Sequence, residues 1–234
     1  MRALAEFIMR GRMQATLVVV GSAALPLLFW LSAAAGSLVL LRRGMNDAFG
    51  ILIWALLPAV TWWVLGDPSI LLIMVGTLLL AQVLRASGSW IRTLLASVVL
   101  GVVFALVLGA TSGELIEALA DAVRTALPQF IEQAKVPAEQ LAGLQDSLIP
   151  TLTGLLASSL QAACVLSLVL ARYWQAALYN PGGFGREFRS VRLHPAVALA
   201  LLFGVLVTPA LGTQAAVLAP ICTVPLFFAG LALG

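Results

Sequence analysis

Long stretches without a single charged residue are the feature that most constrains how this chain can fold. The run Thr16–Leu41 has no charge in 26 residues, and six further apolar runs follow it. The whole chain is 62% hydrophobic and 10% charged, whereas a soluble domain has roughly 25% charged residues. A soluble fold of 234 residues cannot bury so much apolar surface, so lipid must be the solvent for much of it. The sequence therefore predicts an all-α, polytopic integral membrane bundle forming a single transmembrane domain over residues 1–234.

Each of the six later runs is long enough to be read as one membrane crossing. They are Ala48–Gly66, Pro68–Leu84, Thr93–Ala110, Leu148–Ala171, Pro195–Gly212 and Ala215–Gly234. The last run ends in apolar sequence with no charged anchor after it, so we expect the natural chain to continue.

The first run, Thr16–Leu41, has two readings. As one straight helix it would be about 39 Å long, which exceeds the roughly 30 Å hydrocarbon core. Arginines stand before it and after it, and a single crossing would leave one of these clusters outside, against the positive-inside tendency. A helical hairpin bent near Pro26–Trp30 keeps both clusters inside. One kinked, tilted span remains the alternative.

The first 14 residues are predicted to form an amphipathic helix. Leu4, Phe7 and Ile8 fall on one face, and arginines make the other face basic. Such a helix suits the interface of an anionic leaflet. The alternative is a solvated leader that only sets topology.

One long segment, Ser112–Ile149, is not an apolar run. It carries six of the ten acidic residues but only two of the thirteen basic residues. These are Glu114, Glu117, Asp121, Glu132, Glu139, Asp146, Arg124 and Lys135. The other eleven bases flank the apolar runs, which indicates that their loops are cytoplasmic. Segment 112–149 is therefore predicted to be an extracytoplasmic insert, in a bacterial inner-membrane protein whose N-terminus is cytoplasmic.

The insert is expected to be helical. Glu114–Leu127 is amphipathic, with Leu115, Leu119, Val123 and Leu127 as its apolar stripe. Pro128 is expected to interrupt this helix, and a second one is expected to begin at Pro137–Ala138. The insert is either a cap over the mouth of the bundle or a simple connector.

Several functional classes find no support in the sequence. It lacks the phosphate-binding loop, the zinc-protease motif and the nucleophile elbow. A zinc site is not expected from one histidine, His194, and two cysteines, Cys164 and Cys222, that lie inside apolar runs. The bases are not pooled in one patch, so nucleic-acid binding is not expected. We expect no enzymatic activity, no cofactor and no bound metal.

Neutral polar residues at membrane depth are the candidates for ligand binding. Ser158 and Gln161 are three residues apart and share a helix face. They could line a pocket for a small polar molecule with Gln82 opposite. The alternative is that the three make hydrogen bonds between helices.

The cytoplasmic loop 180–193, NPGGFGREFRSVRL, is the most specific string in the chain. A proline and two glycines impose a turn. Phe184 and Phe188 then alternate with Arg186, Arg189 and Arg192. This arrangement suits either insertion beside anionic headgroups or docking to a cytoplasmic partner.

Three segments carry a resemblance to a known family. The start MRALAEFIMRGRMQA, the GDPS turn and RYWQAALYNPGGFGREFRSVRL are similar to the uncharacterised bacterial inner-membrane family typified by YybS. That family is distantly similar to the S components of energy-coupling-factor transporters, which bind a vitamin or metal and rely on a separate ATPase module. The resemblance implies a small-molecule-binding transporter subunit whose partners are the lipid bilayer and an energising module. The competing hypothesis is a membrane scaffold or regulatory protein that docks a partner through loop 180–193.

Overall fold

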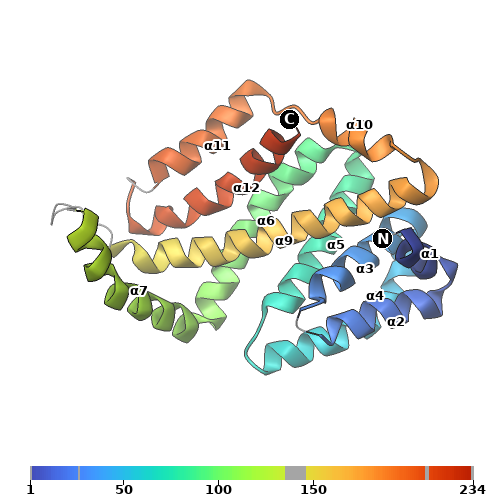
Figure 1. The fold of residues 1–234 in the computed structure, drawn as a ribbon, viewed down its shortest axis with the longest axis horizontal. Helices are drawn as coiled ribbons and strands as arrows, with labels where there is room; N and C mark the ends of the chain where they lie inside the picture. Colours follow the sequence, from blue (N-terminus) through green and yellow to red (C-terminus); the bar gives the residue numbers. More distant parts are fainter. Residues whose placement is uncertain (1, 26, 135–145, 209–210, 233–234) are drawn as a thin grey trace.

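The computed structural model describes residues 2–25, 27–134, 146–208 and 211–232, and in these ranges the chain is helical and has no strand (Figure 1). The elements are α1 (Arg2–Arg10), α2 (Arg12–Ala23), α3 (Phe29–Arg43), α4 (Met45–Val64), α5 (Ser69–Ser87), α6 (Trp90–Thr111), α7 (Gly113–Ala134), α9 (Leu148–Tyr179), α10 (Gly183–Arg189), α11 (Pro195–Val207), η2 (Thr213–Val217) and α12 (Leu218–Leu231).

Four helical segments in the described ranges are long and apolar enough to cross a membrane. They are Ser69–Ser87, Trp90–Thr111, Leu148–Tyr179 and Gln214–Leu231. The apolar helices Ala48–Val64 and Pro195–Val207 are shorter, and at 1.5 Å per residue they reach about 26 Å and about 20 Å. Four of the six crossings expected from the sequence thus coincide with helices long and apolar enough to span a membrane, and the other two runs form shorter apolar helices.

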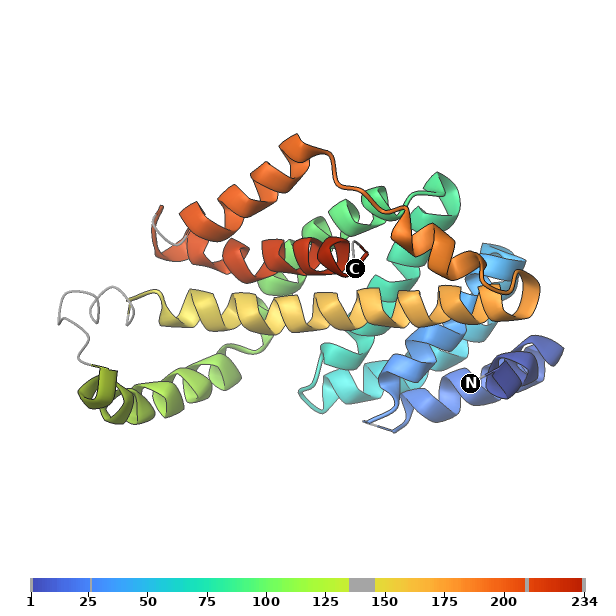
Figure 2. The same cartoon turned by 45° about the horizontal axis from the view of Figure 1, so that its top comes forward.

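Helix α9 is the axis of the bundle. It has 32 residues and runs along most of the molecule in both ribbon views (Figures 1 and 2). It packs against α3, α5, α6 and α12, and it also contacts α1, α7 and α10. Cys164, Leu168 and Trp174 on α9 are completely buried, because neighbouring helices cover α9 on several sides.

The run Thr16–Leu41 folds as two helices, α2 and α3, that pack side by side. The Ser32 hydroxyl donates a hydrogen bond of 2.7 Å to the Val19 carbonyl. Near the other end of the pair, Arg43 Nη2 donates to the Met9 carbonyl at 2.8 Å. The helices are therefore antiparallel, as in the hairpin interpretation and not as in one kinked span. Their close approach relies on small residues, since Ser32, Ala33, Ala34, Ala35, Gly36 and Ser37 are all buried.

Helix α1 does not present its whole apolar face to lipid. Ala5 and Ile8 are completely buried, because α1 packs on α2, α3 and α9. Phe7, which the sequence placed on the same face, is exposed. Gly11 then separates α1 from α2.

Helix α7 differs from the predicted insert in two ways. It continues past Pro128 to Ala134, so the expected break does not occur. Among residues 113–126 of this helix, Ile116 and Ala120 are buried, one position away from the predicted stripe, whose Leu115 and Leu119 are exposed. The buried face rests on α6 and α9. The expected second helix at Pro137–Ala138 lies outside the described residues.

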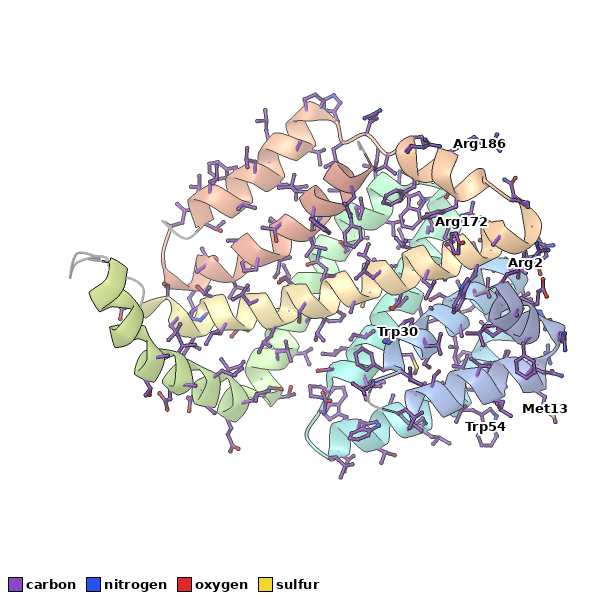
Figure 3. All side chains as sticks on the ribbon, viewed as in Figure 1. Arg2, Met13, Trp30, Trp54, Arg172 and Arg186 are labelled. Atoms are coloured by element: carbon purple, nitrogen blue, oxygen red, sulfur yellow. The ribbon has the colours of Figure 1, made fainter. Side chains whose placement is uncertain are left out.

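The charged residues divide the bundle into two ends. Arg42, Arg43, Arg85, Arg92, Arg172 and Arg186 stand at helix ends or in α10, on the side that we call the arginine end. Figure 3 shows Arg2, Arg172 and Arg186 at this end, away from α7. Helix α7, with Glu114, Glu117 and Asp121, marks the opposite side, which we call the acidic end.

Candidate functional site

The largest cavity that we describe lies at the acidic end, between α6, α9 and the η2–α12 segment. Its volume is about 570 Å³, within the usual range of small-molecule pockets. It is lined by Val102, Ala105, Leu106, Gly109, Ile149, Pro150, Thr153, Gln214, Val217 and Leu218. We refer to it as the acidic-end cavity.

Two glycines shape the acidic-end cavity. A Cβ atom on Gly154 would come within 2.6 Å of the Val217 carbonyl oxygen, so only a glycine lets η2 lie this close to α9. Gly109 borders open space, with no atom within 4 Å of the position that its Cβ would occupy. Gly154 therefore allows η2 to form one wall close to α9, and Gly109 leaves the space beside α6 unfilled.

The lining of the acidic-end cavity is mostly hydrocarbon and contains no ionisable side chain. The Thr153 hydroxyl donates to the Ile149 carbonyl at 2.9 Å, which uses its proton within α9. Gln214 is exposed and offers an amide. Such a surface suits an uncharged, largely apolar molecule that makes a small number of polar contacts.

Ser158 and Gln161 are buried, as their shared face suggested, but neither lines the acidic-end cavity. Gln161 Nε2 donates to Ser97 Oγ of α6 at 3.0 Å, while its Oε1 has no partner. A Cβ on Gly101 would lie 2.6 Å from that oxygen. The Ser158 hydroxyl donates to the Leu155 carbonyl. This geometry is that of a hydrogen bond between helices, with protein packed closely around it.

Gln82 does not lie opposite Ser158 and Gln161. Cys164, three residues from Gln161 on α9, contacts the Ile73 carbonyl, and Gln82 lies nine residues further along α5, about 13 Å at helical rise. It lines a different cavity, at the arginine end, together with Arg43 and Arg85. The structure therefore brings Gln161 and Ser158 together on α9 but places Gln82 elsewhere.

The aromatic residues of loop 180–193 face the bundle. This part of the loop is the short helix α10. Phe184 and Phe188 stack on each other with centroids 5.5 Å apart, and both meet the Trp90 ring edge-on. Tyr173 also meets Phe184 edge-on. Both phenylalanines are thus partly buried anchors and not freely exposed contact residues.

Glu187 was not among the candidate residues predicted from the sequence, yet it makes several contacts in the structure. Its Oε2 accepts from Arg172 Nη2 at 2.6 Å, and its Oε1 accepts from Trp90 Nε1 at 2.8 Å. The sequence offered one signal for this role: Glu187 is the only acid among the arginines of loop 180–193. Such an acid often pairs with a nearby arginine. These bonds join α10 to α9 and α6.

Arg186 and Arg189 lie on α10 and are exposed. Arg189 Nε donates to the Gly185 carbonyl, one turn earlier. The aromatic anchors and Glu187 thus hold a short helix that carries two outward-facing cations, and Figure 3 shows Arg186 at the outside of the molecule.

Comparison with family models, curated proteins and solved structures finds no significant match to this chain.

Proposed function

We propose that this chain is a non-enzymatic integral membrane protein that binds a small, uncharged and largely apolar molecule in the acidic-end cavity. In this proposal the acidic end faces the outside of a bacterial inner membrane and the arginine end faces the cytosol. The protein would act as the binding subunit of a transporter, in the manner of an S component, with a separate energising module.

One observation carries the proposal: a cavity of about 570 Å³ with a hydrocarbon lining opens between three helical elements. Its rim includes Leu106, which is largely exposed, so an apolar molecule has a route from the lipid. The cavity contains no charged side chain and lies at the end of the bundle that carries α7. The excess of arginines at the other end supports the orientation.

The test compares small molecules that co-purify with the protein in lipid nanodiscs. Gly109→Leu is the informative variant, because Gly109 lines the cavity and no atom lies within 4 Å of the position that its Cβ would occupy. Leucine also favours a helix more than glycine does, so unfolding is not the expected cause of any loss. We expect a molecule present in the wild type, identified by mass spectrometry, to fall at least tenfold in this variant.

Gly50→Leu is the matched control. Gly50 also has nothing within 4 Å of its Cβ position, it lies in α4, and it does not line the acidic-end cavity. This control is expected to keep the molecule at the wild-type level. A set of co-purifying molecules that is identical in wild type and Gly109→Leu would contradict the proposal.

The orientation is tested by labelling single cysteines from outside intact cells. Glu117 and Ser190 are both exposed and lie at opposite ends of the bundle. The native Cys164 and Cys222 are buried, so their background is low. Glu117→Cys should react with a membrane-impermeant maleimide and Ser190→Cys should not, and the reverse result would invert the proposed topology.

A second candidate function is a scaffold that holds a cytoplasmic or membrane partner. The observation in its favour is the pair Arg186 and Arg189, exposed on a helix that the bundle holds in place. The test is a pull-down with Arg186→Ala/Arg189→Ala, because these changes remove the charges without touching the aromatic anchors.

Arg192→Ala serves as the control for the scaffold test, since Arg192 is exposed nearby but lies beyond α10. Under this candidate function a partner is lost from the double variant and kept by the control. Partners that are retained equally by both variants would exclude α10 as the docking element.

A further inference from the structure

A second cavity lies at the arginine end, at the turn between α3 and α4. Its volume is about 380 Å³, and it is lined by Arg43, Gly44, Met45, Asn46, Gln82 and Arg85. We refer to it as the turn cavity. Two of its six lining residues are arginines, which distinguishes it from the hydrocarbon-lined acidic-end cavity.

The two guanidinium groups are fixed by backbone carbonyls. Arg85 Nη1 donates to the Leu40 carbonyl at the C-terminal end of α3, at 2.8 Å. Arg43 Nη2 donates to the Met9 carbonyl of α1, also at 2.8 Å. A guanidinium has five N–H donors, and in the described part of the chain each of these groups uses one in a hydrogen bond. Both therefore keep donors for an anion while their positions are set in advance.

Gly44 makes this arrangement possible. Its φ of +96° is unfavourable for other residues, and a Cβ there would lie 2.6 Å from Arg85 Nη1. The turn backbone and the guanidinium thus pack against each other directly. Because Gly44 has no side chain, the Arg85 guanidinium can lie at the wall of the turn cavity.

Gln82 adds a different requirement. Its Oε1 is buried and has no hydrogen-bond partner in the described structure. Gln82 lines the turn cavity, and a buried acceptor without a donor is costly, so a ligand hydroxyl that reaches this oxygen would be favoured. The turn cavity therefore combines donors for an anion with an acceptor for a hydroxyl.

An apolar surface leads away from the turn cavity along two helices. On α4, Met45, Phe49, Ile53 and Leu57 are exposed and follow one another at four-residue spacing, so they form one stripe. On α5, Leu79 and Val75 are exposed and continue the face that carries Gln82. The stripe begins at Met45, which lines the turn cavity itself.

We infer that the turn cavity and this stripe form a binding site for an anionic phospholipid with a hydroxylated headgroup, of the phosphatidylglycerol type. The phosphate accepts hydrogen bonds from Arg43 and Arg85, a headgroup hydroxyl donates to Gln82, and an acyl chain lies on the α4 stripe. The site is separate from the acidic-end cavity, and its occupancy does not depend on the proposed function.

The test measures lipid binding to the detergent-solubilised protein by native mass spectrometry. Three lipids with identical acyl chains are titrated: phosphatidylglycerol, phosphatidylmethanol, which has the same charge but no hydroxyl, and zwitterionic phosphatidylcholine. We expect phosphatidylglycerol to bind most tightly. Each arginine near a phosphate contributes about fivefold in affinity, so Arg43→Gln and Arg85→Gln should each weaken phosphatidylglycerol by about that factor.

Arg92→Gln is the charge-matched control. Arg92 is exposed in the first turn of α6 but does not line the turn cavity. The Arg92→Gln variant should therefore bind phosphatidylglycerol with the same affinity as the wild type. An equal loss in Arg92→Gln, or equal binding of phosphatidylcholine and phosphatidylglycerol by the wild type, would overturn the proposal.

Gln82→Leu keeps the test informative if loss of an arginine impairs folding. It preserves both charges and removes an oxygen that has no partner. In the wild type, one neutral hydrogen bond should make phosphatidylglycerol bind about fivefold more tightly than phosphatidylmethanol. We expect Gln82→Leu to abolish this preference. A preference that survives unchanged would overturn the role of Gln82. Competition by free glycerol 3-phosphate at concentrations similar to the lipid would identify a site for a soluble phosphate and overturn the lipid assignment.

Discussion

Glu187 and Arg172 form an ion pair in which Arg172 Nη2 lies 2.6 Å from Glu187 Oε2 and Arg172 Nε contacts both carboxylate oxygens. Each side chain is a little under one-third exposed. The same carboxylate accepts the indole N–H of Trp90. The pair therefore joins α10, α9 and the start of α6 at the arginine end.

The first prediction concerns this joint. Glu187→Gln should lower the free energy of unfolding by about 1 kcal/mol, because a partly exposed charge-assisted pair is replaced by a neutral amide. Thermal unfolding in detergent, followed by tryptophan fluorescence, measures the change. Glu117→Gln, an exposed position on α7, is the control and should unfold like the wild type. A double-mutant cycle with Arg172→Gln should show coupling, and additive effects would contradict the pairing.

The second prediction concerns the Ser97–Gln161 hydrogen bond. Ser97→Ala should destabilise the protein by about 1 kcal/mol, because it leaves the buried Gln161 amide without its acceptor. Adding Gln161→Leu should recover most of this loss, since it removes both the unpaired amide nitrogen and an oxygen that already lacks a partner. The measurement is thermal unfolding of the two single variants and the double variant. If the double variant is less stable than Ser97→Ala, Gln161 has a role beyond this bond.

The third prediction contrasts two glycines, one in α5 and one in α6, which are both long and apolar enough to span a membrane. A Cβ on Gly76 would lie 2.7 Å from Phe104 Cζ, 2.9 Å from Leu100 Cδ2 and 3.0 Å from Cys164 Sγ. Gly76→Ala should therefore cost about 1–3 kcal/mol through overpacking. Gly109→Ala, which meets open space, should be neutral or stabilising by up to about 1 kcal/mol. Chemical denaturation of both variants tests the predicted difference in sign.

The fourth prediction concerns the wall of the acidic-end cavity. Gly154→Ala should destabilise the protein and displace η2, because the new methyl group meets the Val217 backbone, which cannot rotate away. Any molecule held in the acidic-end cavity should then bind more weakly, as measured by its amount in purified protein. Gly230→Ala, which has nothing near its Cβ position and lies in α12, is the control and should leave both properties unchanged.

Sequence reasoning located the polar groups but not their partners. Its spacing argument put Ser158 and Gln161 on one face, and both are buried. It also put Gln82 opposite them, whereas Gln82 lies at the turn cavity with Arg43 and Arg85. Periodicity states which residues share a face of one helix, but the height at which two helices meet is set by packing. The predicted sidedness of the membrane and the transporter function remain predictions.

The face that a helix buries was also decided by its neighbours. On α7 the leucines are regularly spaced, yet Ile116 and Ala120 are buried while Leu115 and Leu119 stay exposed. On α10, Phe184 and Phe188 pack against Trp90, and Glu187 pairs with Arg172. These are contacts between segments far apart in the chain, and no local pattern contains them.

What the sequence determined by itself was the solvent and the helical class. Uncharged runs of membrane length require lipid, and arginines on both sides of Thr16–Leu41 favoured the hairpin that α2 and α3 form. Only the tertiary structure decided where cavities remain and which side chains line them, because both depend on how closely Gly154 and Gly44 let separate segments approach. Such distances are properties of the packed bundle and not of any one helix.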